Sequence, residues 1–403
     1  MRVVIEKSKP AGTIVAPPSK SMAHRMLLCG GLSEGTSIVH GIAPSQDVLA
    51  TLDCLKALGA DYTYEADTVS IRGIGVPGKG NGTLYCRESG STLRFFLPLC
   101  MFGEIKTMLY GSETLLKRPL GVYEDICNKQ DILFENDGEK ITVAGKLTFG
   151  TFTVPGDISS QFITGLLFAL PLLEGDSRIQ ILPPIESLSY INMTIDALRT
   201  FGVEVSWEDK NTLAIKGNQR FEPKEVRVEG DYSNAAFFAA MNSLGAEVQV
   251  TGLKEDSLQG DKVYKELFDL LEDGGAQIDI SDCPDLGPVL FAVAAAKQGG
   301  VFTGTRRLKI KESDRGSVMA EELRKFGVSV EVGEDTILVK PEKFHRPDVL
   351  LDGHNDHRIV MSLCVLLTLV GGTVDGAEAV NKSMPDFFEK IQQLGVKVRY
   401  ESV

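Results

Sequence analysis

The feature that most constrains this chain is an internal repeat. An amphipathic helical pattern ends in an apolar residue, a glycine and a small apolar residue, and an alternating strand pattern follows; clear copies occupy residues 55–60, 198–203, 323–328 and 391–396. Weaker copies occupy residues 270–278 and 126–133, the second without the glycine. Each glycine lies where a helix is expected to end in a left-handed cap and a strand to begin. Such a repeat indicates one supersecondary unit used several times.

A second repeated phrase precedes these copies. It is a loop rich in Gly, Ser and Asp that opens a strongly apolar helix, and it occurs at residues 17–21, 88–92, 155–161, 229–234, 282–285 and 353–357. The spacing between these loops is similar along the chain and becomes shorter after the fourth. We therefore predict six α/β units from these loops, each made of a strand, a helix, a strand, a second helix and a hairpin.

The chain length of 403 residues exceeds one ordinary domain, so we predict two lobes of three units each. The fourth unit starts near Glu229, which leaves residues 19–228 as the first lobe. Residues 1–18 form an extra strand that could pair with either lobe. No Gly/Ser-rich or Pro-rich tether marks the boundaries near 18 and 228, so we expect a close hinge, a place that favours ligand clefts.

The charge balance limits the possible partners. The chain has 42 Lys and Arg against 55 Asp and Glu, and the net charge of −13 argues against nucleic acid or an anionic membrane as a partner. We place the acidic excess on helices and turns such as residues 321–322 and 272–273. The seven cysteines are scattered without a Cys-x-x-Cys pair, so neither a disulfide framework nor a zinc site is expected. Without a targeting segment or a long apolar run, a cytoplasmic protein is expected.

Cations at the helix-opening loops predict anion binding, because helix N-termini present unpaired N–H groups and a positive dipole end. Lys20, Ser21 and Arg25 lie within about a turn and a half of one such start. The alternative there is a capping sequence with a solvated lysine. Residues 306–315 hold five basic residues before a helix, a pattern typical of either an anion site or a solvated charge run.

Charged residues at the other helix starts leave two interpretations open. Arg358 enters an apolar helix and needs a partner, which is either Asp356 or a bound anion. Asp285 is either an N-cap or a functional acid at its helix entrance. Glu312 is either an ion-pair partner of its basic neighbours or an acid tuned by them.

The motifs of other standard chemistries do not occur. The sequence has no G-x-x-x-x-G-K-[ST] loop, no G-x-G-x-x-G after a strand, no G-x-S-x-G elbow and no H-E-x-x-H. His354 and His357 form a His-x-x-His pair without a further obvious ligand. We therefore expect neither a metal ion nor an organic cofactor.

Taken together, the motifs resemble those of the EPSP synthase (3-phosphoshikimate 1-carboxyvinyltransferase) family of enolpyruvyl transferases. They occur in the family order in the segments 18–25, 90–94, 117–119, 159–162, 187–190, 285, 311–315, 355–358 and 382–387. Each motif is weak alone, but nine in register are specific. The resemblance implies an α/β fold with two similar lobes of three βαβαββ repeats each, the inverse α/β barrel of enolpyruvyl transferases. It also implies that residues 1–18 join 229–403 in the second lobe.

The resemblance implies a reaction as well. The enolpyruvyl group of phosphoenolpyruvate is transferred to the 5-hydroxyl of shikimate 3-phosphate through a tetrahedral intermediate, and phosphate is released. This is a step of the shikimate pathway to chorismate and the aromatic amino acids. The implied partners are the two small-molecule substrates, with no cofactor, no nucleic acid and no membrane, and we expect a monomer. Because Gly90 is retained, sensitivity to glyphosate, which occupies the phosphoenolpyruvate site of this family, is expected.

The family match also implies roles for individual residues. It gives Asp285 as the base and Glu312 and Lys20 as proton-transfer candidates. For shikimate 3-phosphate it implies Lys20, Ser21, Arg25, Ser159, Ser160, Gln161, Ser187, Tyr190, Asp285 and Lys311. For phosphoenolpyruvate it implies Lys20, Gly90, Arg118, Gln161, Arg315, His357, Arg358 and Lys382. Because these cations come from both lobes, anionic ligands are expected to drive closure of the lobes.

Two positions depart from the family pattern. Glu88 stands where Asn is common, and its carboxylate would repel an anion unless it pairs with Arg87 or Arg94. Arg307 replaces an Asn that often contributes to the phosphoshikimate site.

Two alternative functions remain open. The sister enzymes that use UDP-N-acetylglucosamine share the fold, but they carry a reactive Cys in a mobile loop, and residues 115–119 here contain none. A catalytically silent anion-binding protein would not benefit from the carboxylates of Asp285 and Glu312.

Overall fold

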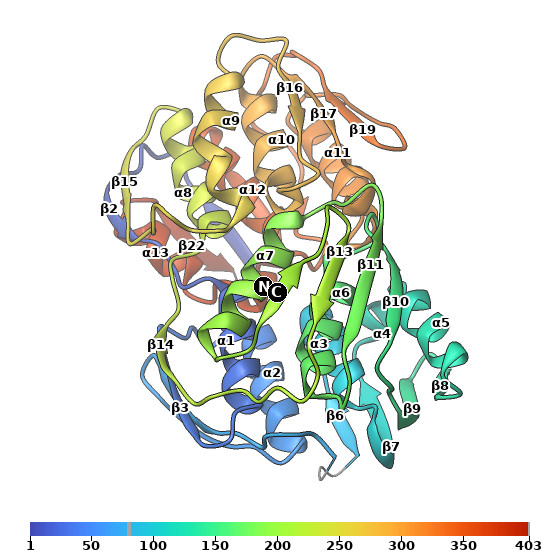
Figure 1. Ribbon diagram of the computed structural model, residues 1–403. Helices are drawn as coiled ribbons and strands as arrows, with labels where there is room; N and C mark the ends of the chain where they lie inside the picture. Colours follow the sequence, from blue (N-terminus) through green and yellow to red (C-terminus); the bar gives the residue numbers. More distant parts are fainter. Residues whose placement is uncertain (79–81, 402–403) are drawn as a thin grey trace. The chain divides into compact units, whose positions relative to one another are not determined.

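The computed structural model describes residues 1–78 and 82–401. The chain forms two compact units (Figure 1). The N-terminal unit is Pro18–Glu229, and the C-terminal unit combines Met1–Pro17 with Gly230–Val403. Each unit has its own hydrophobic core.

The N-terminal unit contains three four-stranded sheets of one design, in which one parallel pair is followed by two antiparallel pairs. The sheet orders are β14-β3-β5-β4, β6-β7-β9-β8 and β10-β11-β13-β12. Their strands are β3 (Thr36–His40), β4 (Asp61–Glu65), β5 (Thr68–Arg72), β6 (Thr83–Tyr85), β7 (Phe102–Tyr110), β8 (Leu133–Asn136), β9 (Lys140–Lys146), β10 (Thr151–Pro155), β11 (Ser177–Leu182), β12 (Val205–Trp207), β13 (Thr212–Ile215) and β14 (Glu225–Arg227). These are the three repeats predicted for this part of the chain.

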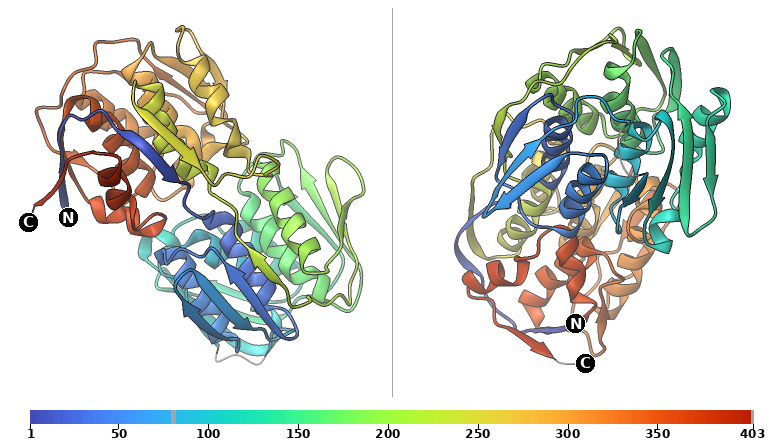
Figure 2. Two further views of the ribbon diagram at one scale, coloured as in Figure 1. Left: turned by 90° about the vertical axis from the view of Figure 1, so that its left-hand side faces the viewer. Right: turned by 90° about the horizontal axis from the view of Figure 1, so that it is seen from below.

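The helices of the N-terminal unit divide into an inner and an outer set. The inner helices α1 (Lys20–Gly31), α3 (Gly90–Leu99) and α6 (Ser160–Ala169) are almost entirely buried, and the sheets lie outside them (Figure 2). The others are α2 (Gln46–Ala57), α4 (Glu113–Leu116), α5 (Gly121–Lys129) and α7 (Leu188–Thr200), with the 3-10 helix η1 (Leu170–Leu172). Serine side chains at Ser19, Ser89 and Ser159 cap the inner helices, as the helix-opening loops predict.

The C-terminal unit repeats the design with changes. Sheet β16-β17-β19-β18 has the same pattern, and β20-β21-β1-β22 takes its third strand from the N-terminus. Among the strands that the structure describes, β15 pairs only with β2. The strands are β1 (Arg2–Ile5), β2 (Ala11–Val15), β15 (Glu247–Thr251), β16 (Gln277–Asp279), β17 (Gly300–Thr303), β18 (Val330–Val332), β19 (Thr336–Val339), β20 (Leu351–Asp352), β21 (Gly372–Asp375) and β22 (Val398–Glu401). The N-terminal segment therefore supplies two strands to this unit.

The prediction of a hairpin in each of the six repeats is wrong for two of them. After β15 the fourth repeat continues through η2 (Gly260–Val263) and α9 (Tyr264–Leu270) directly to β16, which explains the shorter spacing after the fourth loop. In the sixth repeat, within the residues up to 401 that the structure describes, β22 has no hairpin partner of its own, and β1 takes that place. The hydrogen bonds that a hairpin strand would make are supplied by a segment far away in the sequence.

The inner helices of the C-terminal unit are α8 (Tyr232–Ser243), α10 (Gly287–Ala296) and α12 (His357–Val370), and they are also almost entirely buried. The remaining helices are α11 (Arg315–Lys325), α13 (Phe387–Gln393), η3 (Pro284–Leu286), η4 (Arg306–Ile310) and η5 (Ala377–Lys382). The glycine predicted to end α11, Gly327, has a left-handed φ of 85°. Among the described residues, no helix is long and apolar enough to cross a membrane.

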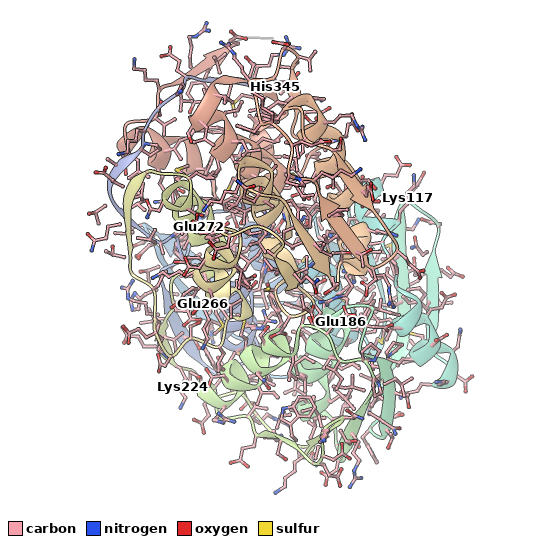
Figure 3. All side chains as sticks on the ribbon, turned by 90° about the horizontal axis from the view of Figure 1, so that it is seen from above. Lys117, Glu186, Lys224, Glu266, Glu272 and His345 are labelled. Carbon is pink, nitrogen blue, oxygen red and sulfur yellow. The ribbon has the colours of Figure 1, made fainter. Side chains whose placement is uncertain are left out.

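The acidic residues do not all lie where the sequence places them. Glu266 and Glu272, in and just after α9, lie on the surface of the C-terminal unit (Figure 3). Glu321 is exposed on α11, but its neighbour Glu322 is completely buried. A buried carboxylate requires compensating partners.

Candidate active site

The starts of the inner helices in the N-terminal unit lie close together. A Cβ placed on Gly90, the first residue of α3, would be 2.7 Å from Arg118 Nη1 and 3.7 Å from Gln161 Oε1. Gln161, at the start of α6, accepts a hydrogen bond from Arg94 Nη1 at 2.7 Å and donates one to Ser91 Oγ at 3.0 Å. Gly90, Arg118 and Gln161 are therefore neighbours, although they come from two helices and one loop. All three are implied for phosphoenolpyruvate.

Lys20 is not the solvated lysine of the capping alternative. Its Nζ pairs with Asp47 Oδ2 at 2.8 Å, and only 14% of the lysine side chain is exposed. Ser19, rather than Ser21, caps the helix by accepting from Met22 N at 3.4 Å. The ammonium is held at the start of α1, where the helix dipole also favours a bound anion.

Arg25 brings α1 and α7 together. Its guanidinium is buried and donates from Nε to Thr194 Oγ1 at 2.9 Å, from Nη1 to the Ser21 carbonyl at 2.7 Å and from Nη2 to the Tyr190 carbonyl at 3.0 Å. Burial lowers the pKa of Arg25 to about 10. Ser187, whose φ of 54° is left-handed, immediately precedes α7 and is buried.

The two serines implied at the start of α6 have different positions. Ser159 caps the helix, and its Oγ accepts from Gln161 N at 3.3 Å. Ser160 is buried as the first helical residue. The described geometry therefore gives the capping role to only one of the three polar residues in this loop.

The sequence did not single out His24, one turn into α1. Its Nδ1 lies 2.7 Å from Thr51 Oγ1, which is 2.9 Å from Thr92 Oγ1, so a chain of hydrogen bonds joins α1, α2 and α3. Burial and the charges of Lys20 and Arg25 hold the pKa of His24 well below its usual range. A neutral ring is thus part of the support under the helix starts.

Asp285 is the centre of the charged cluster in the C-terminal unit. Its Oδ1 lies 2.9 Å from Arg315 Nη1 and 3.3 Å from Lys311 Nζ, and its Oδ2 lies 2.9 Å from Arg358 Nη2. No side-chain cap hydrogen bond is made at the start of α10. The N-cap interpretation of Asp285 is therefore wrong, because three cations hold this carboxylate.

Arg315 is nearly inaccessible to solvent and links three carboxylates. Its side chain is 1% exposed and lies 2.9 Å from Asp285, 2.6 Å from Glu312 and 2.8 Å from Asp356. Burial acts to lower the pKa of Arg315, but Asp356, Glu312 and Asp285 outweigh it and raise the pKa above its usual value. Glu312 thus forms an ion pair with Arg315, and the basic run at 306–315 is not a freely solvated one.

The arginine of the Asn-Asp-His-Arg segment does not pair with Asp356 through its guanidinium. Arg358 Nη2 instead lies 2.9 Å from Asp285 Oδ2 and donates to Ser233 Oγ at 2.9 Å, and only its backbone N–H donates to Asp356 Oδ1. The contact of Arg358 with Ser233, at the start of α8, was not expected from the sequence. The starts of α8, α10 and α12 therefore converge on Arg358.

The remaining residues implied for phosphoenolpyruvate lie beside this cluster. His357 is buried, and its Nδ1 is 3.8 Å from Asp356 Oδ1. Lys382 Nζ, at the end of η5, donates to the Asn355 carbonyl at 2.6 Å. Each unit thus assembles its own share of the implied residues at the starts of its inner helices.

The structure describes the surroundings of both departures from the family pattern, Glu88 and Arg307. The two arginines expected as partners of Glu88 also make other contacts. Arg87 donates to Gln46 and Asp53, and Arg94 donates to Gln161 and the Pro119 carbonyl. Arg307 is buried, and its Nη2 donates to the Ser281 carbonyl at 2.6 Å. The positive charge of Arg307 also contributes to lowering the pKa of Lys311.

Comparison with known proteins places the chain among enolpyruvyl transferases. The model of the family EPSP synthase (3-phosphoshikimate 1-carboxyvinyltransferase) matches residues 5–391. Proteins named 3-phosphoshikimate 1-carboxyvinyltransferase from Clostridium kluyveri and Clostridium perfringens are each 38% identical, covering 100% and 98% of this chain and 99% and 98% of their own.

Solved structures share the fold. An EPSP synthase from Acinetobacter baumannii has a TM-score of 0.79 at 24% identity, with 99% of this chain and 100% of that one covered. The enolpyruvyl transferase NikO from Streptomyces tendae has a TM-score of 0.80 at 14% identity, with 100% and 99% covered. The predicted fold class, two-lobed α/β of the enolpyruvyl transferases, is confirmed.

Proposed function

From the premise that the chain belongs to the EPSP synthase family, we propose how its residues divide the work of the family's reaction. The enolpyruvyl group of phosphoenolpyruvate passes to the 5-hydroxyl of shikimate 3-phosphate, and phosphate leaves. This is the step of the shikimate pathway that leads towards chorismate and the aromatic amino acids. The task of the protein is to bind two polyanions, remove a proton from a hydroxyl and protonate a methylene carbon.

Asp285 is the proposed base. The observation that carries the proposal is the position of its carboxylate among Lys311, Arg315 and Arg358, at 3.3, 2.9 and 2.9 Å. Cations next to a carboxylate favour its charged form, which is the form that can accept a proton. Lys311, Arg315 and Arg358 are also proposed to bind the two substrates. The base is therefore proposed to lie next to the acceptor hydroxyl.

The reaction has an addition and an elimination step. In the addition, the hydroxyl oxygen bonds to C2 of phosphoenolpyruvate, Asp285 takes the hydroxyl proton, and Glu312 or Lys20 supplies a proton to C3. In the elimination, that C3 proton returns, the double bond re-forms and the C2–O bond to phosphate breaks. Fixed positive charge stabilises the phosphate as it leaves.

The remaining residues bind the two substrates. For phosphoenolpyruvate we propose Lys20, Gly90, Arg118, Gln161, Arg315, His357, Arg358 and Lys382. For shikimate 3-phosphate we propose Lys20, Ser21, Arg25, Ser159, Ser160, Gln161, Ser187, Tyr190, Asp285 and Lys311. Each substrate is proposed to be bound by residues of both units. We therefore also propose that the anionic ligands drive closure of the units. We further propose that the enzyme acts as a monomer in the cytoplasm, where its seven free and buried cysteines stay reduced.

The KM for shikimate 3-phosphate should have an unusual pH dependence because Lys311 is one of the proposed ligands of this substrate. Burial lowers the pKa of Lys311, and Asp285 only partly opposes it. A lowered pKa means that the ammonium loses its charge at a lower pH than an ordinary lysine, whose pKa is about 10.4. The KM for shikimate 3-phosphate should therefore rise with pH before pH reaches about 10. Kinetics of Lys311→Arg should show this rise moved to higher pH, since arginine stays charged; the same profile in both enzymes would contradict the role.

Because Gly90 is retained, we expect the protein to be sensitive to glyphosate. We expect the Gly90→Ala variant to be less sensitive. The methyl group of Gly90→Ala would lie 2.7 Å from Arg118 Nη1, so the guanidinium must move. Displacing one charge-assisted hydrogen bond costs about 1.5–3 kcal/mol, so the KM for phosphoenolpyruvate and the inhibition constant for glyphosate should each rise at least about tenfold. Inhibition curves measure both; a wild-type curve that stays flat at millimolar glyphosate contradicts the expected sensitivity.

One assay tests the proposed function against its nearest alternative. Purified protein is mixed with phosphoenolpyruvate and either shikimate 3-phosphate or UDP-N-acetylglucosamine, and phosphate release is followed. Release only with shikimate 3-phosphate supports the proposal. Release only with the nucleotide sugar assigns the sister reaction, and binding without release assigns a silent anion-binding protein.

A further inference from the structure

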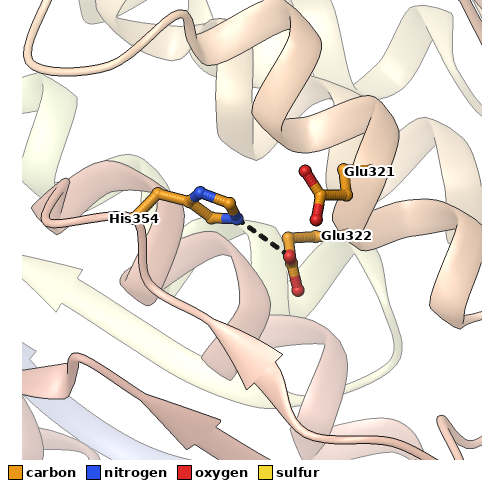
Figure 4. Close-up of side chains that lie close together, drawn as sticks. All are labelled: Glu321, Glu322 and His354. Carbon is orange, nitrogen blue, oxygen red and sulfur yellow. Dashed lines mark hydrogen bonds and ion pairs between the residues drawn. The ribbon is translucent and has the colours of Figure 1, made fainter.

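Glu322 is a buried charge to which the proposed reaction gives no role. It lies on α11, the helix that begins with Arg315, and its exposed fraction is 0%. Its carboxylate accepts hydrogen bonds from Lys325 Nζ at 2.7 and 3.0 Å and from Asp352 N at 3.0 Å. It also accepts one from His354 Nε2 at 2.9 Å, which Figure 4 shows. Asp352 is the last residue of β20, and His354 belongs to the loop between β20 and α12, so Glu322 binds the end of the strand and the loop to α11.

The loop has a backbone conformation that its residues disfavour. His354 and Asn355 have φ values of 47° and 52°, in the left-handed region. A residue other than glycine in this region costs about 1–3 kcal/mol, and asparagine tolerates it better than histidine does. The histidine ring and the N–H of Asp352 are held by one carboxylate, which offsets this cost.

The same loop carries groups that orient the proposed phosphoenolpyruvate ligands. The Asn355 carbonyl accepts from Lys382 Nζ at 2.6 Å. The next residue, Asp356, accepts from Arg315 Nε at 2.8 Å and from the backbone N–H of Arg358 at 2.9 Å. A change in the backbone at 354–355 would therefore move the partners of the two cations Lys382 and Arg315, and with them the capping contact at the start of α12, the helix that carries Arg358.

We propose that Glu322 is a positioning residue, which holds His354 and Asn355 in the left-handed conformation and so positions the cationic groups of Lys382 and Arg315, and the start of α12, for phosphoenolpyruvate. This inference rests on the proposed function. The residue touches neither substrate, and its effect is expected mainly on the KM for phosphoenolpyruvate. Shikimate 3-phosphate depends on the loop less, because most of its proposed ligands lie elsewhere in the chain.

A metal site is the competing interpretation of these side chains. Ligand atoms of Glu321, Glu322 and His354 lie within 4.8 Å of one another. However, the ammonium of Lys325 already contacts both oxygens of Glu322 and would repel a metal cation. The hydrogen bonds therefore favour a structural role for Glu322 over a metal site. Glu321, the neighbouring residue on the same helix, serves as a matched control.

The experiment measures KM for both substrates and the melting temperature in a set of variants. Glu322→Gln should raise the KM for phosphoenolpyruvate about tenfold, with the KM for shikimate 3-phosphate changed less than about threefold. His354→Gly in the Glu322→Gln background should restore the KM for phosphoenolpyruvate to within about threefold of wild type, because glycine adopts the left-handed conformation without help. Glu321→Gln removes the same charge one residue away and should leave both KM values unchanged.

His354→Val keeps the Glu322–Lys325 pair, so it tests the loop even if Glu322→Gln does not fold. A β-branched residue strongly disfavours a positive φ, so it should raise the KM for phosphoenolpyruvate as Glu322→Gln does. The inference is overturned if folded variants keep the wild-type KM for phosphoenolpyruvate, if both KM values rise equally, or if glycine does not rescue. It is also overturned if Glu321→Gln is equally impaired and added Mn²⁺ restores activity. A wild-type protein without substrate-dependent phosphate release would instead refute the proposed function.

Discussion

Asp285→Asn is expected to lower kcat by about 10²–10⁴-fold, the usual contribution of a general acid or base. Asparagine has nearly the same shape but cannot take the hydroxyl proton. It also removes a negative charge from Lys311, Arg315 and Arg358, which lie within 3.3 Å of the carboxylate. The KM values for the two anionic substrates should therefore stay the same or fall.

Steady-state kinetics of phosphate release separate the two effects. Asp348→Asn, a change at an exposed carboxylate of the same unit, is the control and should behave as wild type. A kcat for Asp285→Asn within tenfold of wild type would remove Asp285 from its role as base. A large rise in either KM with little change in kcat would make it a binding residue.

Arg315→Met should destabilise the protein severely. The change leaves the carboxylates of Asp285, Glu312 and Asp356 together without the guanidinium that links them, and Asp356 is 0% exposed. Removing one partner from a buried ion pair typically costs about 3–5 kcal/mol of unfolding free energy. The loss should become smaller as the pH falls, because protonation of the carboxylates removes negative charge that the guanidinium of Arg315 no longer balances.

Denaturant unfolding of the full-length variants measures this loss of unfolding free energy. Arg324→Met is the matched control, since Arg324 is an exposed arginine of the same helix, and it should change the free energy of unfolding by less than about 0.5 kcal/mol. A loss for Arg315→Met equal to that of the control would show that the cluster contributes little. A loss that grows on acidification would contradict the role of Arg315 in balancing the charge of these carboxylates.

Local signals in the sequence were enough to predict the inner helices. Each of the six helix-opening loops precedes one of α1, α3, α6, α8, α10 and α12. Capping serines, left-handed glycines and apolar periodicity act within a few residues, so a repeat of them is visible without a structure. The repeated loops also indicated where the side chains proposed to bind ligands would gather.

Long-range pairing was beyond those local signals. The strand β1 pairs with β21 and β22 at the other end of the chain, and nothing in its own residues identifies these partners. The same holds for the site, where Arg358 binds Asp285 and Ser233 rather than its neighbour Asp356. Glu322 looks like a surface residue beside Glu321 because its partners, Asp352 and His354, come from a later segment.

The fate of the bridging oxygen of phosphoenolpyruvate tests the central claim most directly. The substrate is prepared with ¹⁸O between C2 and phosphorus, and the products formed with shikimate 3-phosphate are examined by ³¹P NMR and mass spectrometry. Addition and elimination at C2 break the C–O bond, so the label should appear in the released phosphate, with one shikimate 3-phosphate consumed for each phosphate. Label retained in a carbon product such as pyruvate, or phosphate released without shikimate 3-phosphate, would contradict enolpyruvyl transfer.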